Sequence, residues 1–468
     1  MEITVRGAEL VDPSPDVVRL VRAELRVTPA SAATSAPPKP FAVYLQETCV
    51  RGGETRVVVP RFWAASRLAH LPTRDARAPG DPVPPDRATF SGRLDPALGQ
   101  PEAVSAVMDS LRGTGGAMLS LPTGYGKTTC AIHVACQLRT KTLVVVHKQL
   151  LATQWEERIR KHVPGARVTR VQGPSSDTSG DFVVAMLQTL VRRRPSPAAT
   201  GRFGLVVVDE AHHVSAPGFS TAMWSMCAPY TLALTATPDR IDGLGRVVNW
   251  FMGEVAFRAR RTQAASTRVR VVAYRSPAYL CPPPTNRRGD VCFPSVVSAL
   301  VADEDRTRLV VEQAVHLARG GRDVLVLSHR VAHCRRVCEL VRAAGVECAT
   351  YLGGDKSVPS QRVMVATYAL TNEGFDCPRL TALVLATPMS NVEQACGRVM
   401  RGRAATDVGA VIVDVKDEWG VCFAQHSKRA AFYRRSGFTL SRAPAPAIGI
   451  DDDAPATDPA TARCMFLA

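Results

Sequence analysis

Two series of short apolar runs, separated by segments with helical patterns, constrain the fold of this chain more than any other feature. The first series lies between Ser91 and Arg260 and contains AMLSL, TLVVVH, FVVAML, LVVVDE and TLALTAT. The second follows the proline-rich segment PAYLCPPPTNRRGD and contains DVLVLSH, RVMVATY, ALVLATP and GAVIVDV. Continuous Val and Leu runs of about four to eight residues are typical of strands buried on both faces of a parallel sheet. The alternation with helices therefore predicts an α/β fold with two doubly wound parallel sheets in tandem.

The chain length and the position of these runs predict the domain boundaries. A chain of 468 residues exceeds the size at which one hydrophobic core keeps growing. We expect one α/β domain over residues 91–262 and a second over residues 263–442. Residues 1–90 are predicted to form a small accessory module with Pro- and Ala-rich linkers, in which FAVYLQETCVRGGETRVVVPRFW forms two strands joined by a Gly-containing turn. The acidic segment 443–468 is predicted to be disordered.

Charge and hydropathy restrict the partners of the chain. The 58 basic and 42 acidic residues give a net charge of +16, which suits a polyanionic partner such as nucleic acid. A nucleotide bias of the encoding genome toward Arg codons is an equal alternative for this excess. No apolar stretch is long enough to cross a bilayer, and the N-terminal MEITVRGAELVDP lacks an apolar signal region. We therefore expect an intracellular protein with no membrane partner.

The cysteines indicate reduced thiols, because the 13 residues include no C-x-x-C pair and an odd number cannot all be paired in one chain. One cluster has the spacing of metal ligands, with two or three of its side chains on one helical face. It consists of His329, His333, Cys334 and Cys338. No second ligand pair completes a zinc site, so an ordinary amphipathic helix after a strand is the favoured interpretation.

The segment LPTGYGKTT lies between the run AMLSL and a helical pattern that begins near Thr128. A strand, a Gly-rich loop and a helix in this order are what a P-loop requires. Gly124 and Gly126 would let backbone amides wrap around phosphate oxygens. Lys127 would contact the β- and γ-phosphates, and Thr128 would bind magnesium. Leu121 stands where the general motif has its first glycine, so a Gly-rich turn is the alternative. The predicted nucleotide contacts are Pro122, Thr123, Gly124, Tyr125, Gly126, Lys127, Thr128 and Thr129.

The apolar run LVVV ends in Asp209-Glu210-Ala211-His212, at the strand edge where doubly wound sheets place their ligands. Asp209 is positioned to hold magnesium, directly or through water, and Glu210 to orient and deprotonate the attacking water. A solvated strand end is the alternative for a lone sequence of this kind. The P-loop that precedes it at the spacing of one α/β domain favours a hydrolytic site.

In the second series, NVEQACGRVMR places Gln394, Arg398 and Arg401 at i, i+4 and i+7, on one face of a helix. Two arginines on a helix are usually surface charge. With a nucleotide site in the preceding domain, they are better interpreted as arginine fingers that complete this site, a role worth about a thousandfold or more in rate.

These motifs, taken in order, resemble those of the superfamily 2 helicases over about Phe41 to Leu440. The resemblance is greatest to the XPB-type branch, especially the helicases of large DNA viruses such as iridoviruses, fish herpesviruses and poxviruses. The stretches that carry it are TLVVVHKQLLATQW, DFVVAMLQTL, VVDEAHHVSAPGFS, LALTATPDRIDGLGRVVNWFMGEV, TYALTNEGFDCP and VEQACGRVMRGR. It implies that both predicted domains are RecA-like.

The resemblance also implies roles for residues outside the P-loop. Three residues would link the nucleotide state to domain movement: His212, Thr235 and Thr237. Two would face the nucleotide, Gly374 and Asp376, and Gln100 is an approximate match to the glutamine that reads adenine. Phosphate-backbone contacts are implied for His147, Lys148 and Gln188. Each has a structural alternative: a threonine on a buried strand, a glycine in a turn, a basic residue on a solvated rim.

The sequence thus predicts an ATP-dependent helicase or translocase that uses ATP and Mg²⁺ and moves on double-stranded DNA, with single-stranded DNA or RNA as alternatives. The resemblance implies viral transcription or replication proteins as partners, and location in the host nucleus, a viral replication compartment or the virion. A duplex translocase without unwinding activity, acting in transcript release, is one alternative. A catalytically silent nucleic-acid-binding scaffold is another, and the intact P-loop and DEAH residues argue against it.

Overall fold

The chain folds into two compact units. The structure is a computed structural model that describes residues 1–29, 39–48, 54–122, 124–236, 243–259, 267–353, 358–371, 377–400 and 409–443. Unit 1 is made of Met1–Gln263, Tyr368–Pro378 and Glu393–Arg401. Unit 2 is made of Ala264–Thr367, Arg379–Val392 and Gly402–Ala468. Of the tail predicted to be disordered, residues 444–468 lie outside the described part of the chain.

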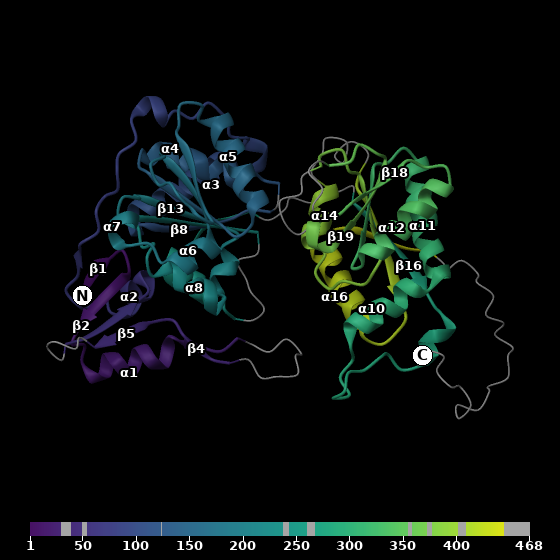
Figure 1. The fold of residues 1–468 in the computed structure, drawn as a ribbon, viewed down its shortest axis with the longest axis horizontal. Helices are drawn as coiled ribbons and strands as arrows, with labels where there is room; N and C mark the ends of the chain where they lie inside the picture. Colours follow the sequence, from purple (N-terminus) through teal and green to yellow (C-terminus); the bar gives the residue numbers. More distant parts are fainter. Residues whose placement is uncertain are drawn as a thin grey trace. The chain divides into compact units, whose positions relative to one another are not determined.

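Unit 1 is built on an eight-stranded sheet with the order β11-β10-β12-β9-β13-β14-β8-β15. Figure 1 labels β8 and β13 of this sheet. Neighbouring strands pair in parallel except β10 and β11. The five runs of the first predicted series form five neighbouring strands, β12, β9, β13, β14 and β8, which confirms the first predicted sheet. The strands β10, β11 and β15 were not predicted, because they lack a continuous apolar run. The bounds are β8 Gly116–Ser120, β9 Thr142–Val146, β10 Val168–Gln172, β11 Ser175–Ser176, β12 Phe182–Met186, β13 Leu205–Asp209, β14 Tyr230–Thr235 and β15 Val255–Arg258.

Helices cover both faces of this sheet, and successive side chains of each strand enter opposite cores. In β9, for example, Val144 and Val146 pack with α3, α4 and α5. Leu143 and Val145 face the other core, which contains α6, α8 and α9. This is the doubly wound arrangement that the sequence predicts. The helices of unit 1 that flank the sheet are α3 Gln100–Thr114, α4 Lys127–Leu138, α5 Gln149–His162, α6 Leu187–Arg193, α7 Pro197–Thr200, α8 Pro217–Met223 and α9 Gly245–Met252.

The N-terminal residues form a second, smaller sheet with the order β5-β6-β2-β1-β7 and a short pair, β3-β4. The predicted pair of strands is confirmed, since β5 and β6 pair antiparallel. The elements β1, β2 and α1 were not predicted. The bounds are β1 Glu2–Thr4, β2 Gly7–Val11, α1 Pro15–Glu24, β3 Arg26–Val27, β4 Phe41–Ala42, β5 Leu45–Thr48, β6 Thr55–Val59, α2 Arg61–Arg67 and β7 Arg74–Asp75.

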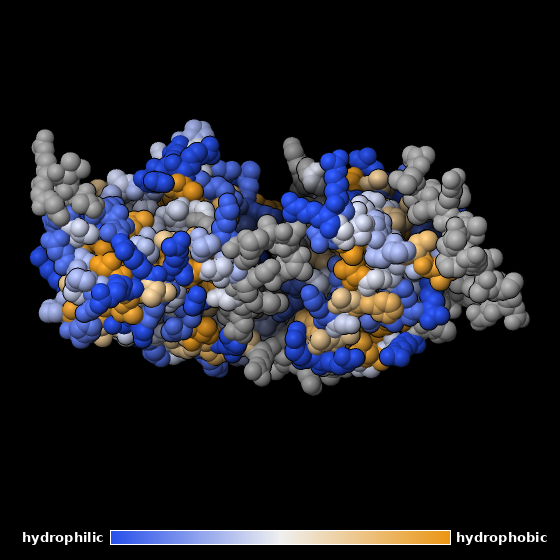
Figure 2. All heavy atoms as spheres, turned by 90° about the horizontal axis from the view of Figure 1, so that it is seen from below, coloured by the Kyte–Doolittle hydropathy of each residue, from blue (hydrophilic) through white to orange (hydrophobic). Residues whose placement is uncertain are grey.

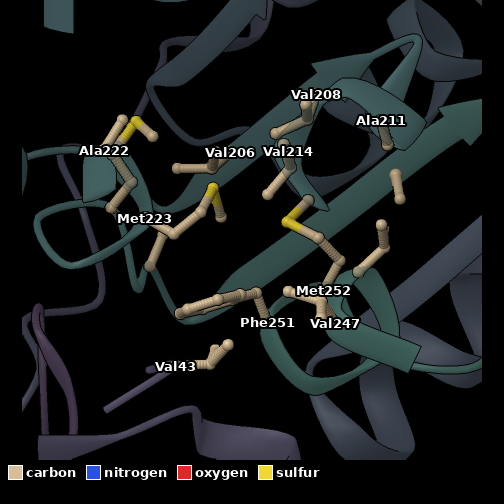
Figure 3. Close-up of a cluster of buried hydrophobic side chains, with 14 of the residues drawn as sticks. Val43, Val206, Val208, Ala211, Val214, Ala222, Met223, Val247, Phe251 and Met252 are labelled. Carbon is tan, nitrogen blue, oxygen red and sulfur yellow. The ribbon is translucent and has the colours of Figure 1, made fainter. Parts of the chain in front are cut away.

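This N-terminal sheet shares a hydrophobic core with the large sheet of unit 1. Figure 3 shows Val43 in one cluster with Phe251 of α9 and with Val206 and Val208 of β13. The buried guanidinium of Arg61 also donates hydrogen bonds to Pro229 O (3.0 Å) and Gly115 O (3.0 Å). The described part of residues 1–90 therefore completes one face of the first α/β domain.

The segment RAPGDPVPPD, predicted as a linker, packs against the same domain. Arg77 donates a hydrogen bond to Ala228 O (2.5 Å), and Arg202 forms an ion pair with Asp81 (2.7 Å). Val83 N donates to Arg139 O (2.9 Å). The Pro-rich composition therefore marks an extended, packed segment here, because proline favours extended backbone as much as it favours linkers.

Unit 2 contains a seven-stranded sheet with the order β18-β19-β17-β20-β21-β16-β22, in which every pair is parallel. The four runs of the second predicted series form β17, β19, β20 and β21. β16 precedes the proline-rich segment after which the second predicted series begins. It was not predicted, because arginines interrupt the apolar residues in its sequence RVRVVAY. The bounds are β16 Arg268–Tyr274, β17 Val324–Ser328, β18 Cys348–Tyr351, β19 Val363–Thr367, β20 Ala382–Leu385, β21 Val411–Asp417 and β22 Thr439–Ala443.

Helices α11 and α12 pack on one face of this second sheet, against Val324, Val363 and Val413 among others. Helix α16 contacts β21. The helices of unit 2 are α10 Phe293–Ala302, α11 Glu304–Arg319, α12 Val331–Ala343 and α16 Val421–Arg435. Two further helices, α13 Tyr368–Thr371 and α14 Glu393–Val399, belong to the later segments of unit 1.

The surface of the chain is mixed. Figure 2 shows apolar patches separated by hydrophilic side chains on the face that it draws. Among the described residues, no helix is both long and apolar enough to span a lipid bilayer.

Candidate nucleotide-binding site

The P-loop connects the end of β8 to the start of α4, as the sequence predicts. Helix α4 begins at Lys127, whose Nζ donates a hydrogen bond to Leu121 O (2.9 Å) and is thereby held across the loop. Gly126 has φ +83°, and a Cβ there would lie 2.3 Å from Gln100 Nε2. Glycine is therefore required for this loop, both by its backbone conformation and by the close approach of Gln100.

Gln100 begins α3 and braces the P-loop. Its buried side chain accepts a hydrogen bond from Asp95 N (2.8 Å) and donates one to Tyr125 O (3.1 Å). The structure thus places the predicted adenine-reading glutamine beside the P-loop, with its amide bonded to backbone groups. Pro122 and Thr129 flank the loop at its two ends, while Thr123 lies outside the described residues.

The carboxylates of the DEAH segment lie at the carboxyl end of β13. This strand is separated from β8 by β14 alone, so Asp209 and the P-loop emerge at the same edge of the sheet. Asp209 is 8% exposed and accepts hydrogen bonds from Trp155 Nε1 (2.8 Å) and from Glu210 N (2.9 Å). Burial and the neighbouring Glu210 raise the pKa of Asp209, against the opposing effects of Trp155 and Lys127.

The donor set suits a magnesium ion with a triphosphate. Asp209 and Thr128 offer a carboxylate and a hydroxyl, the hard oxygen ligands that Mg²⁺ prefers. A buried carboxylate with a raised pKa lacks compensating positive charge, which a bound cation would supply. The buried Oε2 of Glu210 has no hydrogen-bond partner among the residues that the structure describes. These groups are the ones that the sequence assigned to metal binding and water activation.

A cluster of imidazoles lies next to these carboxylates. The ring of His213 lies 4.0 Å from that of His147 and 4.3 Å from that of His212, between ring centroids. His212 Nδ1 lies 3.4 Å from Glu210 Oε2. Burial and then Lys148 lower the pKa of His147, which favours its neutral form. Separate roles were predicted for His147 and His212, whereas His213, whose ring lies between theirs, was not predicted.

The segment predicted to contact nucleic acid is held by Gln188, whose Nε2 donates a hydrogen bond to His147 O (2.7 Å). Lys148 precedes the first residue of α5, and partial burial lowers its pKa. The three residues with predicted backbone contacts therefore lie together at the carboxyl ends of β9 and β12, which are neighbours in the sheet.

Two further side chains of the site, Trp155 and Arg158 on α5, were not predicted. Trp155 donates to Asp209, and Arg158 Nη1 donates to Thr128 Oγ1 (2.9 Å). Their i, i+3 spacing in TQWEERIR was the available signal, since it places both on one helix face.

The remaining predicted residues are placed as follows. Thr235 is buried at the end of β14, in register with Ser120 of β8. Gln394 and Arg398 lie on α14, where Arg398 is 5% exposed and Gln394 Oε1 is buried without a hydrogen-bond partner among the described residues. A buried arginine is not ordinary surface charge. The other four predicted residues lie outside the described part of the chain: Thr237, Gly374, Asp376 and Arg401.

The His and Cys cluster of the second series lies on and before α12, the amphipathic helix that was the favoured interpretation. Both ring nitrogens of His333 are engaged, with Ser328 Oγ (2.9 Å) and Thr307 Oγ1 (3.2 Å). His329 Nδ1 is bonded to Thr387 Oγ1 (2.8 Å). The described residues contain no group of three or more His, Cys, Asp or Glu arranged to hold a metal ion.

Comparison with known proteins supports a helicase fold and family. Residues 93–240 match the family model "Type III restriction enzyme, res subunit". A protein of Acanthamoeba polyphaga mimivirus named "Putative ATP-dependent RNA helicase" is 24% identical over 443 residues, which cover 91% of this chain and 83% of that protein. A protein of African swine fever virus with the same name is 26% identical over 355 residues, covering 69% of each chain.

The solved structure of S. cerevisiae Dbp5 has the same fold, with a TM-score of 0.50 and 12% identity over 74% of this chain and 90% of that one. The predicted RecA-like fold is therefore confirmed. The family match covers the P-loop and DEAH segments, and the viral relatives extend over most of the chain, so the comparisons support a superfamily 2 helicase with the enzyme class of an ATP-dependent helicase.

Proposed function

We propose that the protein is a viral ATP-driven motor that moves on duplex DNA. The observation that carries the proposal is the convergence of Lys127, Thr128, Asp209 and Glu210 at one edge of the unit 1 sheet, together with a buried Asp209 whose pKa is raised. A site of this kind binds a nucleoside triphosphate and hydrolyses it. Mg²⁺, when bound, neutralises charge on the phosphate oxygens.

Each residue has a distinct role in this proposal. Lys127 contacts the β- and γ-phosphates, and Thr128 and Asp209 hold the ion. Glu210 orients the attacking water and accepts its proton, for which its Oε2, which has no hydrogen-bond partner within the described ranges, is available. The γ-phosphate contacts are assigned to Gln394, Arg398 and Arg401, and further nucleotide contacts to Gly374 and Asp376. His212, Thr235 and Thr237 transmit the nucleotide state.

Movement requires a grip on the nucleic-acid backbone. We assign it in unit 1 to His147, Lys148 and Gln188, which lie together at the sheet edge that also carries the P-loop. The net charge of +16 supports binding to phosphates. Because phosphates carry no base information, sequence preference should be slight.

RNA is the second candidate substrate, favoured by the names of the mimivirus and African swine fever virus relatives. Stimulation of ATP hydrolysis by duplex DNA, single-stranded DNA and RNA, measured at one salt concentration, decides between them. Duplex DNA should stimulate most. Strand displacement beside triplex displacement then separates unwinding from translocation, since a pure translocase scores only in the second assay. Function in viral transcription or replication inside the infected cell is part of the same proposal.

The site assignment is tested with Lys127→Ala and Glu210→Gln. Both substitutions should lower the rate of DNA-stimulated ATP hydrolysis by about a thousandfold or more. Lys428→Ala and Glu157→Gln are matched controls at exposed positions and should hydrolyse ATP as the wild type does. Turnover retained in both site variants would overturn the assignment.

A further inference from the structure

Helix α5 brings two side-chain donors to the candidate metal ligands. Trp155 Nε1 lies 2.8 Å from Asp209 Oδ2, and Arg158 Nη1 lies 2.9 Å from Thr128 Oγ1. Thr128 and Asp209 are the two residues assigned to Mg²⁺ above. The same helix face therefore touches both metal ligands, one through a neutral indole and one through a cationic guanidinium.

Among the described residues, Arg158 has no structural ion pair that would account for its position. The neighbouring Arg160 forms an ion pair with Glu156 (3.3 Å) at the surface. Arg158 is only partly exposed and forms no ion pair with any carboxylate in the described ranges; its one hydrogen bond goes to Thr128. Its charge is thus directed at the Thr128 hydroxyl in the first turn of α4.

A magnesium ion and Arg158 compete for this hydroxyl. Mg²⁺ binds its oxygen ligands at about 2.0–2.1 Å and tolerates little distortion. With Arg158 Nη1 at 2.9 Å from the same oxygen, the ion and the guanidinium would lie within about 5 Å of each other, where like charges repel. The donated hydrogen bond also occupies one of the two lone pairs of the hydroxyl oxygen.

We propose that Arg158 is a positioning residue that holds Thr128 Oγ1 in the metal-free site and releases it when Mg²⁺ enters with the nucleotide. This inference rests on the proposed ATPase function. It assigns to α5 a direct response to metal binding, and α5 begins immediately after Lys148, to which backbone contacts are assigned.

The test is a Mg²⁺ titration of the full chain with a fluorescent, non-hydrolysable ATP analogue at fixed concentration. Arg158→Met should lower the half-saturating Mg²⁺ concentration by about tenfold, the equivalent of one charged hydrogen bond. Binding of the analogue in EDTA should stay as in the wild type, which also shows that the variant is folded. Arg158→Gln, which removes the charge but keeps a polar side chain, should lower the half-saturating Mg²⁺ concentration in the same way. This second variant controls for a disturbance of α5 by Met. Arg160→Met is the matched control and should leave the titration unchanged.

A double-mutant cycle with Thr128→Ala locates the effect. If Arg158 acts through the hydroxyl, Arg158→Met should have no further effect in the Thr128→Ala background. An unchanged or higher half-saturating Mg²⁺ concentration in both Arg158 variants overturns the inference and leaves the proposed function intact. Failure of the wild-type chain to bind the analogue with Mg²⁺ would instead overturn the proposed function.

Discussion

The two units bury carboxylates in their sheets in opposite electrostatic states. In unit 1, Asp209 ends β13, next to Glu210, and no lysine or arginine among the described residues forms an ion pair with it. In unit 2, Asp414 of β21 is fully buried and forms an ion pair with Arg429 (2.8 Å). The same fold class thus contains one carboxylate short of positive charge and one that is neutralised.

The pKa shifts of the two groups follow from this difference. Burial and Glu210 raise the pKa of Asp209. Burial would also raise the pKa of Asp414, but the Arg429 guanidinium and His426 hold it below its ordinary value. Buried charge is costly unless it is paired, so an unpaired carboxylate persists where a ligand supplies the missing charge. The contrast distinguishes the carboxylate to which we assign metal binding from one that stabilises the fold.

Removal of Arg429 should give the largest effect, because it would convert the neutralised site into an uncompensated one. Arg429→Met leaves the fully buried Asp414 without its guanidinium and also removes the hydrogen bond to Met389 O (2.7 Å). The free energy of unfolding of unit 2 should fall by about 3–5 kcal/mol. Amide hydrogen exchange of peptides from β21 measures this loss in unit 2 alone.

The matched control is Arg435→Met, at an exposed position of the same helix, which should change stability by less than about 0.5 kcal/mol. Wild-type protection of β21 in Arg429→Met would show that the ion pair does not stabilise the unit, and the contrast between the two carboxylates would lose its energetic basis.

The pH dependence of stability should have opposite signs in the two units in EDTA. Asp209 binds its proton more tightly in the folded chain. Its contribution to the free energy of unfolding is therefore present below pH 3.8 and is lost as pH rises through its raised pKa. Asp414 binds its proton less tightly in the folded chain. Its contribution to the free energy of unfolding is therefore present above pH 3.8 and is lost as pH falls through its lowered pKa. Hydrogen exchange of β13 and β21, corrected for the intrinsic pH dependence of exchange, measures both.

Asp209→Asn should remove the dependence in β13 and leave that in β21 unchanged. If the protection of β13 amides from hydrogen exchange increased with pH above pH 3.8 in the wild type, this result would contradict the raised pKa of Asp209.

The sequence predicts the sheets and the main site because both depend on local patterns. Continuous Val and Leu runs mark the buried parallel strands, and motifs that follow such strands must meet at one edge of the sheet. The arginines that decide the electrostatics were not predicted as partners. Arg158 reaches Thr128 from another helix, and Arg429 meets Asp414 across a helix and a strand. Spacing places a side chain on a face, but the tertiary packing decides which group it touches. The N-terminal sheet was mostly missed for the same reason, since its strands are short and its core is completed by α9.

The smallest effects should come from two substitutions that each remove one neutral donor from a carboxylate. Trp155→Phe removes the Nε1 hydrogen bond that lowers the pKa of Asp209, so the pH window in which β13 loses protection should move upward. Tyr433→Phe removes a hydrogen bond (3.1 Å) to Asp414 but leaves Arg429 in place, so the window of β21 should stay below 3.8. Each lost bond costs about 1 kcal/mol. The smaller ring of Trp155→Phe also lowers stability, but equally at every pH, so the position of the window isolates the electrostatic effect. An unmoved window in Trp155→Phe would mean that the Trp155 hydrogen bond does not influence the charge state of Asp209 and that burial and Glu210 determine it.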